Sequence, residues 1–331
     1  MEKRSFLSWQ VIFLLVLVGG CRHDPPSDPP APLPEPPPPQ YLTPDQARQL
    51  ANEEDFKKIV YFLASDNLKG RMTGSEGLKT ALNFAEYRYK QLGYEPKRQT
   101  FNTRYGSVDN MTAYLQGKTD KSVVICGHLD HIGNTRSLSR DPRQSGYRVG
   151  ANDNASGSAM VFELAETLRG LKQLNYSYLF INFTAEEIGL VGSQYYVKNP
   201  LYPLDKIVMV LNFDMVGIPV RDRLTAFNAG SVSQFKYMEP IAKKYGLSVI
   251  ARGQSGGSDH VPFSNQGVPN IFFHTGLDAN YHTVGDTPEK LNYSGMEKIG
   301  QCMFDFILAC DAVQSEPARL TPTNFPYEAK H

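Results

Sequence analysis

The sequence predicts an α/β fold, with three α/β/α layers around a mostly parallel, mixed central sheet. Four short apolar runs, rich in β-branched and aromatic residues and bounded by glycine or polar residues, indicate buried strands. They are SVVIC (122–126), YLFINFT (178–184), KIVMVLNF (206–213) and NIFFHT (270–275). Helical patterns occupy 154–171, 192–198, 233–245 and 289–313. Strands that alternate with helices favour a parallel sheet covered on both faces.

Side chains that commonly bind metals lie at the ends of these elements. The five candidates are His128, Asp153, Glu187, Asp214 and His282. In open parallel sheets, ligands bind in the crevice beyond the carboxyl ends of the strands. We therefore expect the five side chains to converge there.

This ligand set predicts a pair of Zn²⁺ ions. Histidine and carboxylate ligands together suit zinc, and catalytic zinc keeps one position open. Three carboxylates and two neutral imidazoles supply three negative charges against four positive charges, and a bound hydroxide would supply the fourth. With five ligands for two ions, one carboxylate must bridge. Paired ions lower the pKa of a shared water and stabilise a developing oxyanion, which is the chemistry of peptide hydrolysis.

Three further side chains have predicted catalytic or orienting roles. Glu186 and Glu187 are adjacent and cannot point the same way in a regular element. A turn can direct Glu187 to metal and Glu186 to water as general base. Tyr281 offers a phenol to the oxyanion, and Asp130 is placed to orient the imidazole of His128.

Each of these residues also has a simpler explanation when taken alone. A Glu-Glu pair often begins an exposed helix, Asp153 is suited to cap a helix, and a lone histidine is often structural. Asp214 is harder to explain in this way, because an unpaired carboxylate after a buried run is costly. Their convergence in one crevice favours a metal site.

Six segments, in order, carry a family resemblance. They are GHLDHIG (127–133), GANDNASG (150–157), TAEEIGLVGS (184–193), NFDMVG (212–217), SDHVPF (258–263) and YHTVGDT (281–287). Together they resemble metallopeptidase family twenty-eight, which contains secreted bacterial di-zinc aminopeptidases and has carboxypeptidases and glutaminyl cyclases as relatives. The stretch FLASDNLKGRMTGSEG (62–77) is similar to the family's N-terminal signature.

The resemblance implies a zinc-exopeptidase-like fold and a role for each matching residue. It implies that Asp153 bridges the ions and precedes a cis peptide bond to Asn154, and it leaves open which ion takes Glu187 and which takes Asp214. Glu186 matches the family's general base, Tyr281 its oxyanion donor and Asp130 its histidine-orienting acid. Asp259 matches an acidic position near the site.

One segment departs from the family pattern. HIGNTRSLSRDPRQSGYRVG (131–150) is longer and more basic than the family leads us to expect, with Arg136, Arg140, Arg143 and Arg148. We expect a solvated loop. The alternative is a preference for acidic peptide termini.

The N-terminal residues predict export. Lys3 and Arg4 precede an apolar stretch at 6–18 that is too short for an ordinary membrane span, which predicts a signal peptide at 1–20. Gly19-Gly20-Cys21 resembles the cleavage site of bacterial lipoproteins, so Cys21 is predicted to carry lipid and to anchor the chain in a membrane facing the periplasm or cell exterior. Ordinary cleavage, leaving a soluble protein, is the alternative.

The domain boundaries follow from composition. Ten prolines among residues 25–39 predict an extended spacer, so 21–42 forms a linker. The catalytic domain is predicted at 43–313 and a loose tail at 314–331. Lysine plus arginine and aspartate plus glutamate number 34 each, so charge gives no case for nucleic acid as a partner. The four cysteines do not indicate a disulfide framework.

The expected function is removal of the N-terminal residue from peptides with a free amino terminus. Two alternatives stay open. A glutaminyl cyclase shares the fold but uses one zinc and typically has tryptophan at the position of Tyr281. A binding protein on an inactive scaffold is expected to have lost ligands, and all five are present.

Overall fold

The computed structural model describes residues 41–254, 257–313 and 316–320. The predicted signal peptide, Cys21 and most of the proline-rich linker lie outside this range. Within it, one mixed sheet of eight strands has the order β1-β2-β4-β3-β5-β8-β6-β7. The strands are β1 (Lys97–Thr103), β2 (Gly106–Leu115), β3 (Ser122–His128), β4 (Ser177–Phe183), β5 (Ile207–Phe213), β6 (Arg223–Phe227), β7 (Ser248–Arg252) and β8 (Asn270–His274).

The centre of the sheet is parallel, which confirms the predicted fold class. Strands β4, β3, β5 and β8 pair in parallel, as do β6 and β7. Antiparallel pairs join β1 to β2, β2 to β4, and β6 to β8. Every residue of β3, β4, β5 and β8 is buried, as expected for strands covered on both faces.

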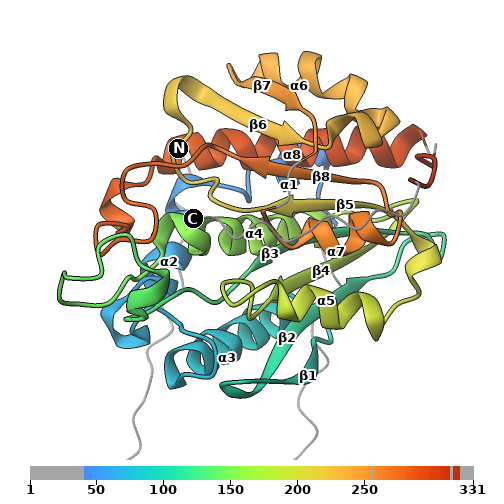
Figure 1. Ribbon diagram of the computed structural model, residues 1–331. Coiled ribbons are helices and arrows are strands. Elements are labelled where there is room, and N and C mark those ends of the chain that lie inside the picture. The colour runs from blue at the N-terminus through green and yellow to red at the C-terminus, as the bar shows by residue number, and fades with distance from the viewer. Residues whose placement is uncertain (1–40, 255–256, 314–315, 321–331) are drawn as a thin grey trace, which may run out of the picture. The chain divides into compact units, whose positions relative to one another are not determined.

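Helices cover both faces of the sheet (Figure 1). They are α1 (Pro44–Arg48), α2 (Glu53–Leu63), α3 (Glu76–Gln91), α4 (Gly157–Arg169), α5 (Val191–Lys198), α6 (Met238–Lys244), α7 (His260–Asn265) and α8 (Tyr293–Val313). Successive strand side chains face opposite ways, so Val123 and Ile125 join the larger core with α4 and α8. Val124 and Cys126 join the smaller core with α5 and α7.

Several predicted helix bounds differ in the structure. The pattern at 233–245 forms a 3₁₀ segment at Ser233–Tyr237 before α6, and α8 begins at Tyr293 rather than at residue 289. The helix predicted from residue 154 begins at Gly157, because residues 151–156 form an irregular turn with non-helical angles at Asp153 and Asn154. In the described part of the predicted tail, at 316–320, the amide of Leu320 donates to the carbonyl of Gly267 at 2.9 Å.

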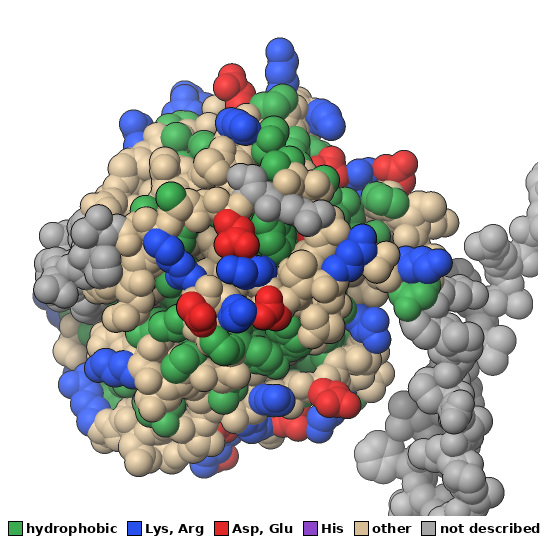
Figure 2. All heavy atoms as spheres, turned by 90° about the vertical axis from the view of Figure 1, so that its right-hand side faces the viewer, with side chains coloured by type: hydrophobic (Ala, Val, Ile, Leu, Met, Phe, Trp, Pro, Cys, Tyr) green, Lys and Arg blue, Asp and Glu red, His purple; other side chains and the backbone are tan. Residues whose placement is uncertain are grey.

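Surface and cysteine chemistry are unexceptional. On the face in Figure 2, basic and acidic side chains are interspersed. Cys126, Cys302 and Cys310 are buried free thiols. Across residues 41–320 as described, no helix has both the length and the apolar character needed to cross a bilayer.

Candidate metal centre

The five predicted ligands meet at one edge of the sheet. His128 is the last residue of β3, and Asp214 directly follows β5. Glu187 lies four residues beyond β4, and His282 lies eight residues beyond β8. Because these strands are parallel, their carboxyl ends share one edge, and the irregular turn before α4 brings Asp153 to the same place.

The five side chains form two clusters that share Asp153. In the first cluster, Nε2 of His128 lies 3.3 Å from Oδ1 of Asp153 and 3.6 Å from Oδ1 of Asp214. In the second cluster, Nε2 of His282 lies 3.0 Å from Oδ2 of Asp153 and 3.0 Å from Oε2 of Glu187. Asp214 therefore belongs with His128, and Glu187 with His282, the choice that the sequence leaves open.

The donor set fits bound cations. Buried carboxylates need positive partners, and Asp153, Glu186, Glu187 and Asp214 are all at most 8% exposed. Burial on its own would lower the pKa of His128, but Glu186, Asp153 and Asp214 raise it well above its ordinary value. Likewise Glu187 and Asp153 overcome burial and raise the pKa of His282 to about 11. The carboxylates thus strongly favour positive charge at this site.

Backbone carbonyls orient both ligand imidazoles. Nδ1 of His128 lies 3.1 Å from the carbonyl oxygen of Asp130, and Nδ1 of His282 lies 2.8 Å from that of Leu138. A carbonyl only accepts, so each Nδ1 carries a proton, and Nε2 is the ring atom that each imidazole can offer to a metal ion. Both Nε2 atoms are buried and face carboxylate oxygens of the two clusters.

Asp130 contacts His128 through its backbone and the two glutamates through its side chain. Its carbonyl, rather than its carboxylate at 3.8 Å, is in hydrogen-bond range of His128. The carboxylate instead accepts from the amides of Glu186 and Glu187 at 3.1 and 3.4 Å. Asp130 therefore fixes the turn that separates the two glutamates.

The turn after β4 directs Glu186 and Glu187 to different clusters, as expected for adjacent residues in a sharp turn. Ala185 has φ of 60°, so the chain leaves β4 abruptly. Oε2 of Glu186 lies 4.0 Å from Nε2 of His128, beside the first cluster. Glu187 joins the second cluster.

Asp286 anchors the segment that carries the shared ligand. Its carboxylate accepts from the amides of Asn152 and Asp153 at 2.7 and 3.0 Å. Burial raises the pKa of Asp286 to about 7. The peptide bond between Asp153 and Asn154 is cis, which confirms that expectation.

Tyr281 and Asp259 border the centre. The ring of Tyr281 is buried and lies 3.9 Å from the ring of His282, centroid to centroid. Asp259 is fully buried, and burial raises its pKa to about 7. The catalytic role of Tyr281 stays a prediction.

The basic segment after His131 is mostly exposed between residues 134 and 147, as expected of a solvated loop, and it also contacts residues of the centre. Besides Leu138, the amide of Arg140 donates to the carbonyl of His282 at 3.0 Å. The guanidinium of Arg140 lies 4.6 Å from the ring centroid of Tyr281. Arg148 is buried and binds Asp141 at 2.6 Å, which in turn accepts from the amide of Val284 at 2.9 Å. The sequence pattern gave no sign of the contacts with Tyr281, His282 and Val284, because they join residues about 140 positions apart.

His131 is a site residue that sequence reasoning missed. It groups with Asp153, Glu187 and His282, all within reach of one ion, while Glu186 groups with His128 and Asp214. The available signal was a second histidine three residues after His128 in GHLDHIG.

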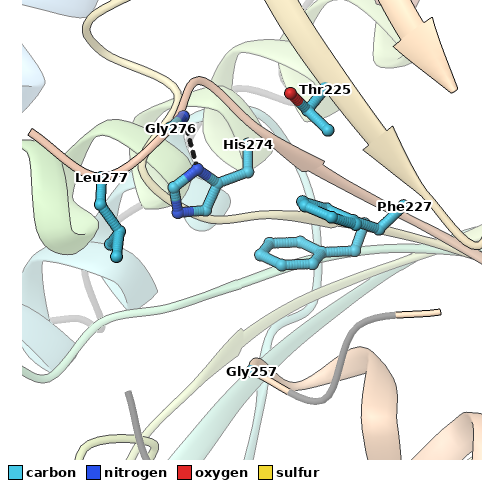
Figure 3. Close-up of a pocket in the computed structure, with 7 residues that line it drawn as sticks. Thr225, Phe227, Gly257, His274, Gly276 and Leu277 are labelled. Atoms are coloured by element: carbon cyan, nitrogen blue, oxygen red, sulfur yellow. Dashed lines mark hydrogen bonds between the residues drawn. The ribbon is translucent and has the colours of Figure 1, made fainter. Parts of the chain in front are cut away.

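A mostly apolar pocket lies against β6 and β8 (Figure 3). Its volume is about 240 Å³, and its lining is Thr225, Phe227, Gly257, Phe272, His274, Gly276 and Leu277. The amide of Gly276 donates to Nδ1 of His274 at 2.6 Å, which fixes that ring. Thr275 bonds to the carbonyl of Met215, next to Asp214, so the pocket wall is tied to the metal cluster.

Sequence comparison decides the family. The model of peptidase family M28 matches residues 110–307. This chain belongs to peptidase family M28. Among curated M28-like relatives, leupeptin-inactivating enzyme 1 of Streptomyces exfoliatus is 34% identical over 246 residues, covering 69% of this chain and 50% of that protein. Aminopeptidase YwaD of Bacillus subtilis is 31% identical over 165 residues, covering 46% of this chain and 36% of that protein. The chain thus spans half the length, or less, of these relatives.

Solved structures agree on the M28 fold. A zinc aminopeptidase from Bacillus subtilis has a TM-score of 0.68 at 15% identity, covering 81% of this chain and 98% of that one. The glutaminyl cyclase of Porphyromonas gingivalis has a TM-score of 0.66 at 18% identity, covering 77% and 97%. At these identities the likeness establishes the fold alone.

Proposed function

We propose that this chain is an aminopeptidase that uses two zinc ions. The observation that carries the proposal is the division of the Asp153 carboxylate, whose Oδ1 faces His128 and whose Oδ2 faces His282. His128 and Asp214 would hold one ion, Glu187 and His282 the other, and Asp153 would bridge them. Bound zinc in such a pair lowers the pKa of a shared water and stabilises negative charge on the substrate oxygen.

The residues of the chain would do the rest of the chemistry. Glu186 is buried beside the first cluster and is not needed as a ligand, so it is available to accept the proton of the attacking water and pass it to the leaving amine. The phenol of Tyr281, adjacent to His282, is proposed to donate to the carbonyl oxygen as it becomes negative.

The apolar pocket would receive the side chain of the first substrate residue. Phe227 and Phe272 stack with ring centroids 5.5 Å apart and form one wall. An engineered apolar cavity of about 150 Å³ accommodates benzene, so a pocket of about 240 Å³ has room for leucine or phenylalanine side chains. Among the lining residues that the structure describes there is no lysine, arginine, aspartate or glutamate, which favours uncharged first residues.

We further propose that the protein is exported and anchored by lipid on Cys21, facing the periplasm or cell exterior. The support is the sequence at 1–21 together with the proline-rich spacer. Electrospray mass spectrometry of the protein from bacterial membranes tests this: a lipidated N-terminus at Cys21 supports it, and an unmodified mature chain contradicts it.

A peptide-degradation assay tests the activity. The purified zinc-loaded protein is incubated with leucine-first peptides that have free or acetylated termini and with a glutamine-first peptide, and products are followed by mass spectrometry. We expect stepwise loss of residues from free termini only. Glu186→Gln keeps the shape of the side chain but not its basicity, and we expect it to lower kcat by about 10²–10⁴-fold while zinc content is retained.

The same assay distinguishes the alternatives. Loss of ammonia from the glutamine-first peptide without hydrolysis would identify a glutaminyl cyclase. Removal of residues from the carboxyl end would identify a carboxypeptidase. Intact peptides throughout, with zinc bound, would favour a binding protein.

A further inference from the structure

We propose that His131 is a positioning residue dedicated to the second cluster, where it fixes both Glu187 and His282 for one of the two ions. The proposal rests on the two-ion centre proposed above. His131 is 1% exposed and is not one of the five predicted ligands.

The first step of the argument is the contact with Glu187. Nδ1 of His131 lies 2.7 Å from Oε1 of Glu187, while Oε2 of the same carboxylate lies 3.0 Å from Nε2 of His282. A carboxylate in this contact accepts, so Nδ1 of His131 carries the proton and is not available as a ligand atom. His131 therefore holds one oxygen of Glu187 and leaves the other facing the ion.

The second step is the contact with the histidine ligand. The rings of His131 and His282 meet at 75°, with centroids 5.4 Å apart. Nδ1 of His282 itself lies within hydrogen-bond distance of the carbonyl oxygen of Leu138. A hydrogen bond at one edge and a ring packed against it together restrict the orientation of the imidazole.

The third step is that the His131 ring packs directly against the backbone of Gly150. Gly150 has φ of +61°, and a Cβ there would lie 2.4 Å from Cγ and 2.5 Å from Cδ2 of His131. The guanidinium of Arg71 donates to the carbonyl of Gly150 at 2.9 Å, and the amide of His131 donates to the carbonyl of Arg71 at 3.3 Å. The ring thus sits in a cradle that excludes any larger residue at position 150.

These contacts are one-sided. The polar side-chain contacts of His131 go to Glu187 at 2.7 Å and to the shared Asp153, whose Oδ2 lies 3.9 Å from Nδ1. Loss of the His131 side chain should therefore weaken the binding of one ion and leave the binding of the other unchanged.

Zinc affinities of the whole protein test this, measured by competition with a chromophoric chelator and by metal analysis after dialysis. Substitution of such supporting residues typically costs about 10–100-fold in metal affinity. We expect His131→Ala to lower the affinity for one zinc ion by about that factor and to leave the affinity for the other unchanged. His131→Asn, which keeps an N–H donor, should recover part of the loss.

A double-mutant cycle identifies the ion that is affected. We expect His131→Ala to have a smaller effect in a Glu187→Gln background, because the contact is already altered, and its full effect in an Asp214→Asn background. Ile132→Ala is the matched control, since Ile132 is the buried apolar neighbour, and it should lower stability without selecting one ion. Thermal unfolding of the metal-free variants verifies that each one folds.

Three outcomes would overturn the proposal. Equal weakening of both ions would indicate a general structural role, and unchanged affinities would show that the contact is dispensable. A wild-type protein that binds only one zinc would overturn the two-ion centre itself. In contrast, two ions in the wild type with unaltered affinities in His131→Ala would overturn only the role of His131.

Discussion

A buried acid remote from the metal centre should make the stability of this protein depend on pH. Glu163 on α4 is fully buried, and its Oε1 lies 2.8 Å from Nη2 of Arg88 on α3. That guanidinium nitrogen also binds Glu166 at 2.6 Å, while Oε2 of Glu163 makes no hydrogen bond within the described residues. Arg88 is thus shared and satisfies Glu163 only in part.

Protonation of Glu163 follows from this environment. Burial raises its pKa to about 8 from an ordinary 4.5, although Arg88 acts in the opposite direction. The folded state therefore binds a proton that the unfolded state releases above pH 4.5. Preferential protonation of Glu163 in the folded state therefore adds to the free energy of unfolding. This added stability is fully present below about pH 4.5 and is lost as the pH rises to about 8. At about 1.4 kcal/mol per pKa unit, the loss is on the order of 4 kcal/mol.

Glu163→Gln removes the titration while keeping the shape of the side chain. We expect the variant to gain stability relative to the wild type as pH rises from 5 to 8, by on the order of 4 kcal/mol. Urea unfolding followed by circular dichroism at several pH values measures the difference, and effects of zinc cancel when both proteins are compared at the same pH. Glu166→Gln is the control: its side chain is 27% exposed, so the effect should be smaller. A difference that stays constant from pH 5 to 8 would refute the reasoning, because it would mean that Glu163 is ionised beside Arg88 throughout.

Two further predictions concern the pocket and the segment at 134–148. Leu277→Trp should fill the pocket and raise KM for phenylalanine-first peptides by about 10-fold or more relative to alanine-first peptides, since a lost apolar contact is worth about 1–3 kcal/mol; an unchanged ratio would place the first side chain elsewhere. Asp141→Asn weakens the ion pair with buried Arg148 and should destabilise the protein by about 3 kcal/mol or more, as measured by urea unfolding. A loss under 1 kcal/mol would show that this segment does not depend on the pair.

The part of the fold that the sequence predicted is the part with an unambiguous pattern. The central strands β3, β4, β5 and β8 are buried on both faces and therefore form continuous apolar runs. The edge strands were missed because their residues alternate in burial, as in β1, or are largely exposed, as in β7. Their polar residues do not differ from those of loops.

The candidate site shows the same limit in another form. The candidate metal ligands could be picked out because each is a chemically distinctive residue, and all but Asp153 lie at or within eight residues after the end of a strand. Supporting contacts were not, because they use ordinary groups: the carbonyl of Leu138, the amides of Asn152 and Asp153, and the space above Gly150. A backbone atom leaves no signature in the sequence, and its partner is set by tertiary structure.

The two clusters also differ in how the fold supports them. The ligands of the first cluster, His128 and Asp214, stand at the ends of two adjacent strands, where the hydrogen bonds of the sheet fix the backbone. The ligands of the second cluster lie on loops, four and eight residues beyond their strands. Hydrogen bonds between strands do not fix the backbone of a loop. Glu187 and His282 therefore depend on contacts from other segments, including those of His131 and Leu138. The second ion should therefore be the one whose affinity changes most readily when residues outside the ligand set are replaced.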